Sequence, residues 1–271
     1  MAVDIEIICI GNELLIGKVK DTNAYYLAKQ ATKLGANVKR VTVIQDTIKE
    51  IETSINEAID RKPHFIVTTG GLGPTFDDKT LQGIAKALNR ELEVNPKALA
   101  MVKQRTEEYA KKRGLPTEIK LTPPRVKMAT LPEETEVVTN PIGTAPGMRA
   151  DVDGTVLFAL PGVPIEMEAI FEQTIAPLIK KAVGSNVFCE KSIFADNIFE
   201  SRLAPLIDKV MSDNLGVYIK SHPMRTDNKP YVELHLTINA RQEQTPTEKL
   251  VKAAKELALL IKAADGVVVE A

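Results

Sequence analysis

The sequence contains no tryptophan, and aromatic residues make up only 4% of its 271 positions. A surface that binds nucleic acid by base stacking needs aromatic side chains, so their scarcity argues against that function. The 35 basic and 36 acidic residues give a formal net charge of −1, which offers no basic excess to attract nucleic acid. No apolar run approaches the roughly 20 residues of a membrane span. We therefore expect neither a nucleic-acid partner nor a membrane.

Cysteine is also scarce, with only Cys9 and Cys189. We expect these two in different domains, so a disulfide is not predicted and a reducing cytoplasm fits. Asp4 and Glu6 precede the first apolar run, which is wrong for a signal peptide. A hydrophobic content of 44% is ordinary for a soluble chain, and the length suits one large domain or two.

The first ninety residues alternate between short apolar runs and helical patterns. Strands are expected at 5–10, 37–44 and 64–69, and helices at 21–34, 48–60 and 79–88. This β-α-β-α-β-α order predicts an α/β fold with a mainly parallel sheet, doubly wound and covered on both faces. Beyond it we expect a helix at 95–113, mostly irregular chain at 115–135, a hairpin of 148–150 with 155–160, and a helix ending near 182.

Near Gly184 the pattern changes. Strands are expected at 187–195, 217–221, 231–239 and 266–270, and helices at 200–213 and 247–264. The order β-α-β-β-α-β predicts a small split α+β sandwich. We therefore place two domains at residues 1–182 and 185–271.

Residues 70–78 join a predicted strand to a predicted helix and hold three glycines followed by Asp77 and Asp78. A glycine turn between a strand and a helix is typical of phosphate sites, because backbone N–H groups can approach an anion there. Two carboxylates would repel phosphate unless a divalent cation lay between them. The stretch therefore predicts a metal-assisted phosphate or pyrophosphate site.

Other acids follow other strands of the predicted sheet. Glu13, Asp46 and Glu166 should share one sheet edge with Asp77 and Asp78, because ligands bind at the carboxyl ends of parallel strands. Each has a purely structural alternative. One aspartate of the pair is expected to cap the helix at 79–88, Asp46 would serve as a strand-end turn residue, and Glu166 would favour a helix start by its charge.

Two asparagines are further candidates. Asn23 either caps its helix or faces the site. Asn140, with the loop at 143–147, forms either a backbone wall of the site or only a tight turn. Other motifs fail: the loop at 11–19 departs from a P-loop in spacing and lacks its Ser/Thr, no dinucleotide fingerprint or Gly-x-Ser-x-Gly is present, and the three histidines lack zinc-ligand spacing.

Four motifs together resemble the N-terminal domain of the CinA (competence/damage-inducible) family. They are Gly11-x-Glu13-Leu14-Leu15-x-Gly17 with Asp21-Thr22-Asn23; Thr69-Gly70-Gly71-Leu72-Gly73-Pro74-Thr75-x-Asp77-Asp78-x-Thr80; Asn140-Pro141-x-Gly143-x-Ala145-Pro146-Gly147; and Leu160-Pro161-Gly162-Val163-Pro164-x-Glu166-Met167. The resemblance covers about residues 3–180. That domain is similar to the molybdopterin-binding proteins of the MoaB/MogA/MoeA group.

The resemblance implies an ADP-ribose pyrophosphatase that yields AMP and ribose 5-phosphate, using a divalent metal (Mg²⁺, Mn²⁺ or Co²⁺) and helped by K⁺. It assigns metal binding to Asp77 and Asp78, and activation of water to Glu13 or Asp46. The substrate-binding positions it marks are Gly11, Asn23, Thr69, Gly70, Gly71, Gly73, Thr75, Asn140, Gly143, Ala145, Gly147, Pro161, Gly162 and Glu166.

Residues 185–271 resemble the KH-like middle domain of CinA proteins. The Gly-x-x-Gly loop that clamps nucleic acid is missing, so RNA binding is not expected. These 271 residues include no stretch that resembles the deamidase domain of full-length relatives, so we do not expect deamidase activity from them. The family suggests a homodimer, with a trimer as the alternative. Two other functions stay open: molybdopterin binding or adenylyl transfer in molybdenum-cofactor synthesis, and nucleotide binding without catalysis.

Overall fold

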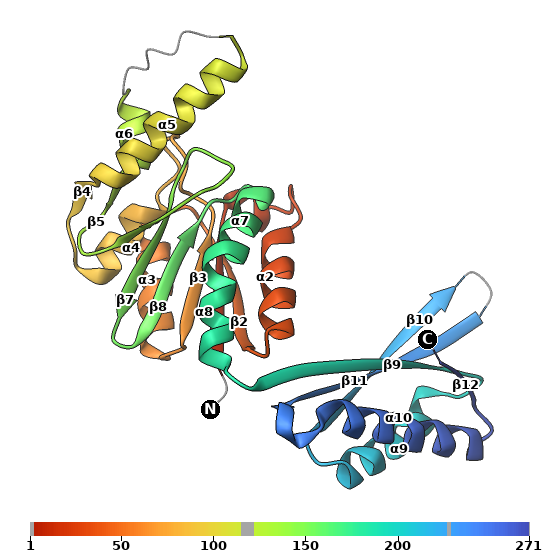
Figure 1. Ribbon diagram of the computed structural model, residues 1–271. Helices are drawn as coiled ribbons and strands as arrows, with labels where there is room; N and C mark the ends of the chain where they lie inside the picture. The colour runs from red at the N-terminus through yellow and green to blue at the C-terminus, as the bar shows by residue number, and fades with distance from the viewer. Residues whose placement is uncertain (1–2, 115–121, 227–228, 271) are drawn as a thin grey trace. The chain divides into compact units, whose positions relative to one another are not determined.

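The computed structural model of the protein describes residues 3–114, 122–226 and 229–270. The chain divides into two compact units, Met1–Thr32 with Ala36–Ala182 and Lys33–Gly35 with Val183–Ala271 (Figure 1). Each unit is described by itself. Of the stretch expected to be irregular, residues 115–121 lie outside the described residues.

The first unit is built on a six-stranded sheet of order β2-β1-β3-β8-β7-β6. Its strands are β1 (Asp4–Ile10), β2 (Asn37–Ile44), β3 (Phe65–Thr69), β6 (Glu136–Val138), β7 (Gly147–Val152) and β8 (Thr155–Leu160). The first four in spatial order run parallel, and β7 pairs antiparallel with both β8 and β6. The predicted mainly parallel sheet is thus confirmed. All five residues of β3 are buried, because the strand lies in the middle of the sheet between β1 and β8.

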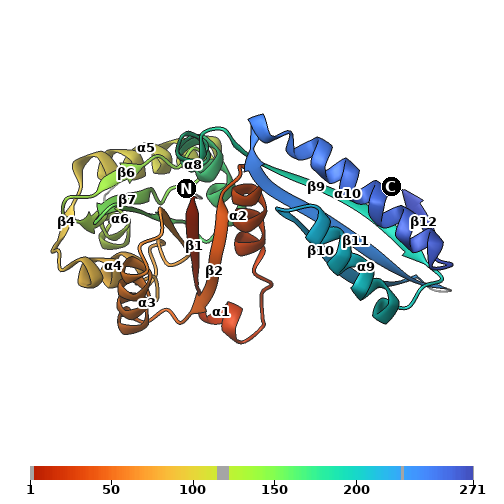
Figure 2. The same ribbon diagram turned by 90° about the horizontal axis from the view of Figure 1, so that it is seen from below.

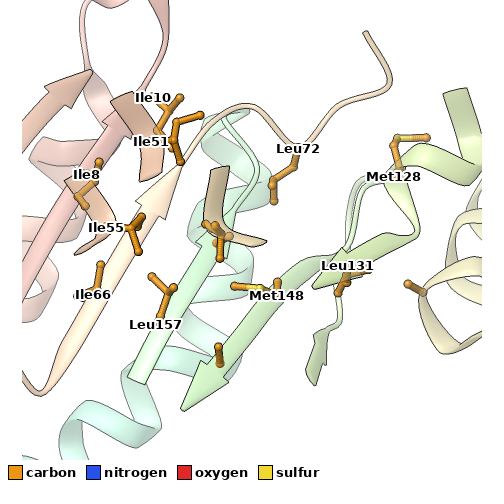
Figure 3. Close-up of a cluster of buried hydrophobic side chains, with 14 of the residues drawn as sticks. Ile8, Ile10, Ile51, Ile55, Ile66, Leu72, Met128, Leu131, Met148 and Leu157 are labelled. Atoms are coloured by element: carbon orange, nitrogen blue, oxygen red, sulfur yellow. The ribbon is translucent and has the colours of Figure 1, made fainter. Parts of the chain in front are cut away.

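Helices cover both faces of this sheet. They are α2 (Thr22–Lys33), α3 (Ile48–Asp60), α4 (Thr80–Leu88), α5 (Pro96–Lys112), α7 (Pro164–Ile170) and α8 (Ala176–Val183). Figure 2 shows α3 and α4 on one face and α2 and α8 on the other. Ile51 and Ile55 lie on one face of α3 and are fully buried in one cluster with Ile8, Ile66 and Leu157 of the sheet (Figure 3).

The structure differs from expectation in three short segments. Asn12–Leu15 forms a helix, α1, within the expected first loop. Leu92–Val94 (β4) and Thr130–Pro132 (β5) pair as a small antiparallel ribbon that no pattern indicated, because a three-residue strand carries almost no periodicity. Between them, α6 (Pro123–Met128) is a short helix in the region expected to be mostly irregular.

The expected hairpin and the helix after it are present with changed limits. Strands β7 and β8 are joined by Asp153 and Gly154, whose φ angles of 48° and 87° are those of a two-residue hairpin turn. The helix expected to end near residue 182 is interrupted by a π-helical turn at Phe171–Ile175, between α7 and α8.

The second unit has a four-stranded sheet of order β10-β11-β9-β12 with two helices on one face (Figure 1). Its elements are β9 (Asn186–Asp196), α9 (Glu200–Asp213), β10 (Val217–Thr226), β11 (Lys229–Arg241), α10 (Pro246–Ala263) and β12 (Val267–Glu270). Alternate residues of the strands, such as Leu234 and Leu236, pack with Leu203 and Leu257 of the helices. Within the described ranges of the chain, no helix is long and apolar enough to cross a membrane.

Candidate functional site

A cavity of about 850 Å³ lies where four parallel strands of the first unit end. The loops after β1, β2, β3 and β8 all reach it, because parallel strands bring their carboxyl ends to one edge of the sheet. Thirteen predicted residues line it: Glu13, Asn23, Asp46, Thr69, Gly70, Gly71, Gly73, Asp77, Asp78, Ala145, Pro161, Gly162 and Glu166.

Five predicted substrate-binding residues do not line this cavity: Gly11, Thr75, Asn140, Gly143 and Gly147. The N–H of Gly11 donates to Ile44 O at 3.1 Å, which joins the ends of β1 and β2. Gly147 begins β7 and pairs with Val138. These glycines shape the backbone around the site, so the direct contacts predicted for them are not supported.

Asn140 acts as the organiser of its loop. Its Oδ1 accepts from the N–H groups of Ile142 and Gly143 at 3.1 and 2.7 Å, and its Nδ2 donates to Ala145 O and Glu166 Oε2 at 2.8 and 2.7 Å. The side chain is 2% exposed, so all of its hydrogen-bonding groups are used inside the protein. Asn140 therefore holds the carboxylate of Glu166 at the cavity wall.

The glycine turn begins at Gly70, a position where no residue with a Cβ fits. Gly70 has a φ of +100°, and a Cβ placed on it would lie 2.2 Å from Ile10 O. Its N–H donates to Leu160 O at 3.0 Å, and its carbonyl accepts from the buried Thr80 hydroxyl at 2.8 Å. The prediction that Gly70 presents its N–H to a ligand is therefore wrong, since that group is already bonded. Gly70 instead joins the turn to the end of β8 and to the start of α4.

Leu72 anchors the same turn from below. Its side chain is 4% exposed and belongs to the buried cluster drawn in Figure 3, with Met128 and Ile84. A turn held by a buried leucine on one side and Thr80 on the other has a fixed shape. Gly71 and Gly73 are thereby placed at the cavity wall.

The two aspartates of the turn face a shared threonine. Thr75 Oγ1 lies 2.5 Å from Asp77 Oδ1 and 2.6 Å from Asp78 Oδ2, and the Thr75 N–H donates to Asp78 Oδ2 at 2.8 Å. The prediction that one aspartate caps the next helix is wrong: Lys79 occupies the N-cap of α4, without a side-chain cap. A hydroxyl carries one proton and can serve only one carboxylate at a time. The Thr75 hydroxyl can serve Asp77 while the Thr75 N–H serves Asp78, so two negative charges lie side by side in the turn.

Lys127 supplies a positive charge to this turn from α6. Its Nζ donates to Thr75 O. Burial lowers the pKa of Lys127, while Asp78 and Asp77 oppose that change, so the ammonium and both carboxylates are close enough to interact. The hydrogen bond from Thr75 lowers the pKa of Asp77, and the charge of Lys127 contributes. No local pattern indicated this contact, because Lys127 lies about 50 residues beyond the two aspartates in a segment expected to be mostly irregular.

Asp46 shares the electrostatic field of the other acids. Its Oδ2 accepts from the Asn12 N–H at 2.9 Å. Burial is the largest cause that raises the pKa of Asp46; the Asn12 N–H opposes it, and the charges of Glu13, Asp77 and Asp78 raise it further. The charges of three acids from two neighbouring loops therefore reach Asp46 across the cavity, as the strand order predicted.

The start of α2 forms another wall. Asp21 caps the helix, with Oδ1 accepting from the Ala24 N–H at 2.9 Å. Asn23 is 8% exposed and donates through Nδ2 to Gly162 O at 2.8 Å, which joins this wall to the loop after β8. Burial raises the pKa of the nearby Cys9 thiol to about 12, so Cys9 stays protonated and is no nucleophile.

Several lining residues were missed by the sequence interpretation, namely Lys20, Thr106, Thr122 and Arg125. Lys20 and Arg125 bring positive charge to an otherwise acidic cavity, which suits an anionic ligand. One signal was present for Arg125: Thr122 followed by two prolines is a typical helix start, and the basic residue comes next.

A metal ion bound here would need ligand or water oxygens to complete its coordination. Among the side chains that the structure describes, no three Asp, Glu, His or Cys residues converge to hold a metal ion. Mg²⁺ commonly binds one or two carboxylates and takes its other oxygens from water and substrate phosphates. Asp77 and Asp78 suit that mode of binding and do not suit a closed protein cage.

Comparison with known proteins agrees with this architecture. A family profile described as "Probable molybdopterin binding domain" matches residues 6–181. The fold and the cavity define a mixed α/β ligand-binding domain of that type. A protein named CinA from Thermoplasma acidophilum, of unknown function, has a crystal structure that is 37% identical, with a TM-score of 0.57 over 68% of this chain and 99% of that one. The chain belongs to the CinA family.

Several relatives match over almost the whole chain. A protein of Pyrobaculum calidifontis is 42% identical over 257 residues, which is 94% of this chain and 95% of that one. A protein of Aeropyrum pernix is 39% identical over 252 residues, which is 93% and 91% of the two chains. Both matches extend through the two units.

Proposed function

We propose that this protein is a metal-dependent nucleotide pyrophosphohydrolase that splits ADP-ribose into AMP and ribose 5-phosphate. One observation carries the proposal: Glu13, Asp46, Asp77 and Asp78 line one cavity with a rigid glycine turn. Acids for a cation and a water, beside backbone groups for phosphate oxygens, are the parts that cleavage of a pyrophosphate bond needs.

The turn would bind the pyrophosphate. Gly71 and Gly73, which line the cavity, would offer backbone N–H groups to phosphate oxygens, and Lys20 and Arg125 add positive charge at the wall. Asp77 and Asp78 would hold the divalent ion, which neutralises charge on the phosphates when bound. Without that ion the acids would repel the substrate.

Asp46 is the best candidate for the general base. A base works best when its pKa approaches the working pH, and burial with three neighbouring acids moves the pKa of Asp46 in that direction. The Asn12 N–H fixes one carboxylate oxygen and leaves the other to accept a proton from water. That water would add to phosphorus as the bridging P–O bond breaks, leaving one phosphate on each product. Glu13, whose side chain is exposed, would orient the same water.

The direct test is AMP release from ADP-ribose by the purified full chain with Mg²⁺, Mn²⁺ or Co²⁺, with and without K⁺. We expect EDTA and Asp77→Asn to abolish turnover. Asp60→Asn is the matched control, because this exposed acid ends α3, away from the cavity. Tight binding of ADP-ribose without turnover under every metal would refute hydrolysis and leave a nucleotide-binding module.

A second candidate is a role in molybdenum-cofactor synthesis, by binding molybdopterin or transferring an adenylyl group to it. The match to the molybdopterin-binding profile over residues 6–181 favours it. Molybdopterin that co-purifies with the protein, detected by the fluorescence of its oxidised pterin, would support this function over the first.

A further inference from the structure

A second cavity of about 510 Å³ adjoins the glycine turn. It shares Gly71, Leu72, Gly73 and Asp78 with the main cavity, so a ligand whose phosphate lies at the turn has this space within reach. Its volume falls in the range of about 300–1,000 Å³ that is usual for small-molecule sites.

The walls of the second cavity are mostly apolar and come from separate elements. Leu81 belongs to α4, Leu92 to β4 and Val126 to α6, and Pro123 and Leu72 complete the apolar lining. Leu92 is 37% exposed, which leaves its apolar surface available to a ligand. Such walls favour a flat and uncharged group, whereas the main cavity, with its four acids, favours a cation and phosphates.

A few polar groups border the same space. Gln82, in the first turn of α4, carries an amide that both donates and accepts, and Thr130 and Lys127 lie nearby. The edge of a purine or pterin ring presents adjacent donor and acceptor atoms, which one amide can pair in two hydrogen bonds. Apolar walls with one such amide are the chemistry that recognises a fused nitrogen heterocycle.

We propose that the second cavity binds the fused heterocyclic ring of the ligand, purine or pterin, while the glycine turn holds its phosphate. The position of the phosphate rests on the function proposed above. The ring site gives the protein selectivity for a base-bearing ligand over a plain sugar phosphate. The short ribbon of β4 and β5 then has a role, because Leu92 and Thr130 are its contributions to the cavity.

Titration calorimetry of the full chain with AMP, ribose 5-phosphate and 6-hydroxymethylpterin tests this assignment. Leu92→Ala and Gln82→Leu should each bind the ring-bearing ligand about ten-fold more weakly, the scale of a lost apolar or polar pocket contact. Ribose 5-phosphate affinity should not change. Val94→Ala is the matched control, because Val94 lies on the same strand, is 44% exposed and does not line the cavity.

Three outcomes would overturn the ring site: neither AMP nor the pterin binds the wild type, Val94→Ala weakens ring binding as much as Leu92→Ala, or the variants weaken ribose 5-phosphate equally. Which ring binds the wild type separates the nucleotide from the pterin. Because this experiment measures binding, a failure of the proposed ring site can be distinguished from a failure of the proposed hydrolase activity. A protein that needs Leu92 for AMP but never cleaves ADP-ribose would refute only the hydrolase.

Discussion

Replacing Gly70 by alanine should destabilise the fold and disturb the site. The loss of stability can be worked out from one close contact and one backbone angle. The new Cβ would lie 2.2 Å from Ile10 O, a backbone atom of buried β1 that has no flexible side chain to move. The φ of +100° is also unfavourable for any residue with a Cβ. Gly154 provides the matched control, since its φ of +87° imposes similar strain while nothing lies within 4 Å.

The two variants separate strain from steric contact. Positive φ costs about 1–2 kcal/mol, and the stiffer unfolded chain returns about 0.4–1 kcal/mol, so Gly154→Ala should lose about 1 kcal/mol. The steric overlap of the new Cβ with packed backbone costs roughly 1–3 kcal/mol more. We therefore expect Gly70→Ala to lose about 2–4 kcal/mol.

Urea unfolding followed by far-UV circular dichroism measures both losses, because the chain has no tryptophan to report by fluorescence. Both glycines lie in the first unit, so they are compared within the same transition. Ligand binding at the turn should fall in Gly70→Ala and stay normal in Gly154→Ala. If the two variants lost stability equally, within about 0.5 kcal/mol, the close approach of Gly70 to Ile10 would not constrain the turn.

Three further predictions concern Asp46, Asn140 and Arg61. Because the folded state raises the pKa of Asp46, ionisation of this carboxyl group destabilises the fold as pH rises from the ordinary value of 3.8 through the raised one. Asp46→Asn should therefore be more stable than the wild type at pH 7 and should lose turnover. If the substitution left the acid limb of the pH–rate profile unchanged, Asp46 would be excluded as the base. Asn140→Ala should cost about 2–3 kcal/mol in urea unfolding, because it leaves buried N–H and C=O groups without partners; a loss below that of an ordinary surface variant would contradict this. Arg61→Met should cost about 3 kcal/mol of stability, because Glu6 is 4% exposed and accepts two 2.8 Å hydrogen bonds from Arg61. Adding Glu6→Gln should recover much of this stability, because it removes the unpaired buried charge. If the double variant recovered none, the charge of Glu6 would not be the cause.

The sequence carried enough information for the sheet and for the membership of the site. Apolar runs ending in loops of special composition identify the carboxyl ends of parallel strands, so Glu13, Asp46 and the glycine turn could be assigned to one edge without knowing any distance. The loops then meet at one edge because β2, β1, β3 and β8 are parallel neighbours in the sheet. Residues that stand directly after a buried strand were therefore placed correctly.

The roles of individual residues within those loops were harder to predict. Asp78 precedes a helix by two positions, which looks like a cap, yet it bonds to Thr75 three residues before it. A backbone N–H that looks available to phosphate, as at Gly70, is used by a strand distant in sequence. Asn140 and Lys127 act through partners 26 and 52 residues away. Such contacts depend on tertiary geometry, and no local pattern encodes them.

The charges at the glycine turn are unfavourable for the stability of the protein without a ligand, and they fit the ligand site proposed above. Thr75 offers one hydroxyl proton to two carboxylates, Lys127 contributes its charge from behind the turn, and Asp46 is already pushed toward its neutral form. An apolar or neutral turn would avoid that cost. The rigid support from Leu72 and Thr80 keeps the acids together despite their repulsion, and a divalent cation with phosphate oxygens would relieve it. A ligand that brings such charge should therefore stabilise the first unit, in proportion to its affinity, and Asp77→Asn should reduce that gain.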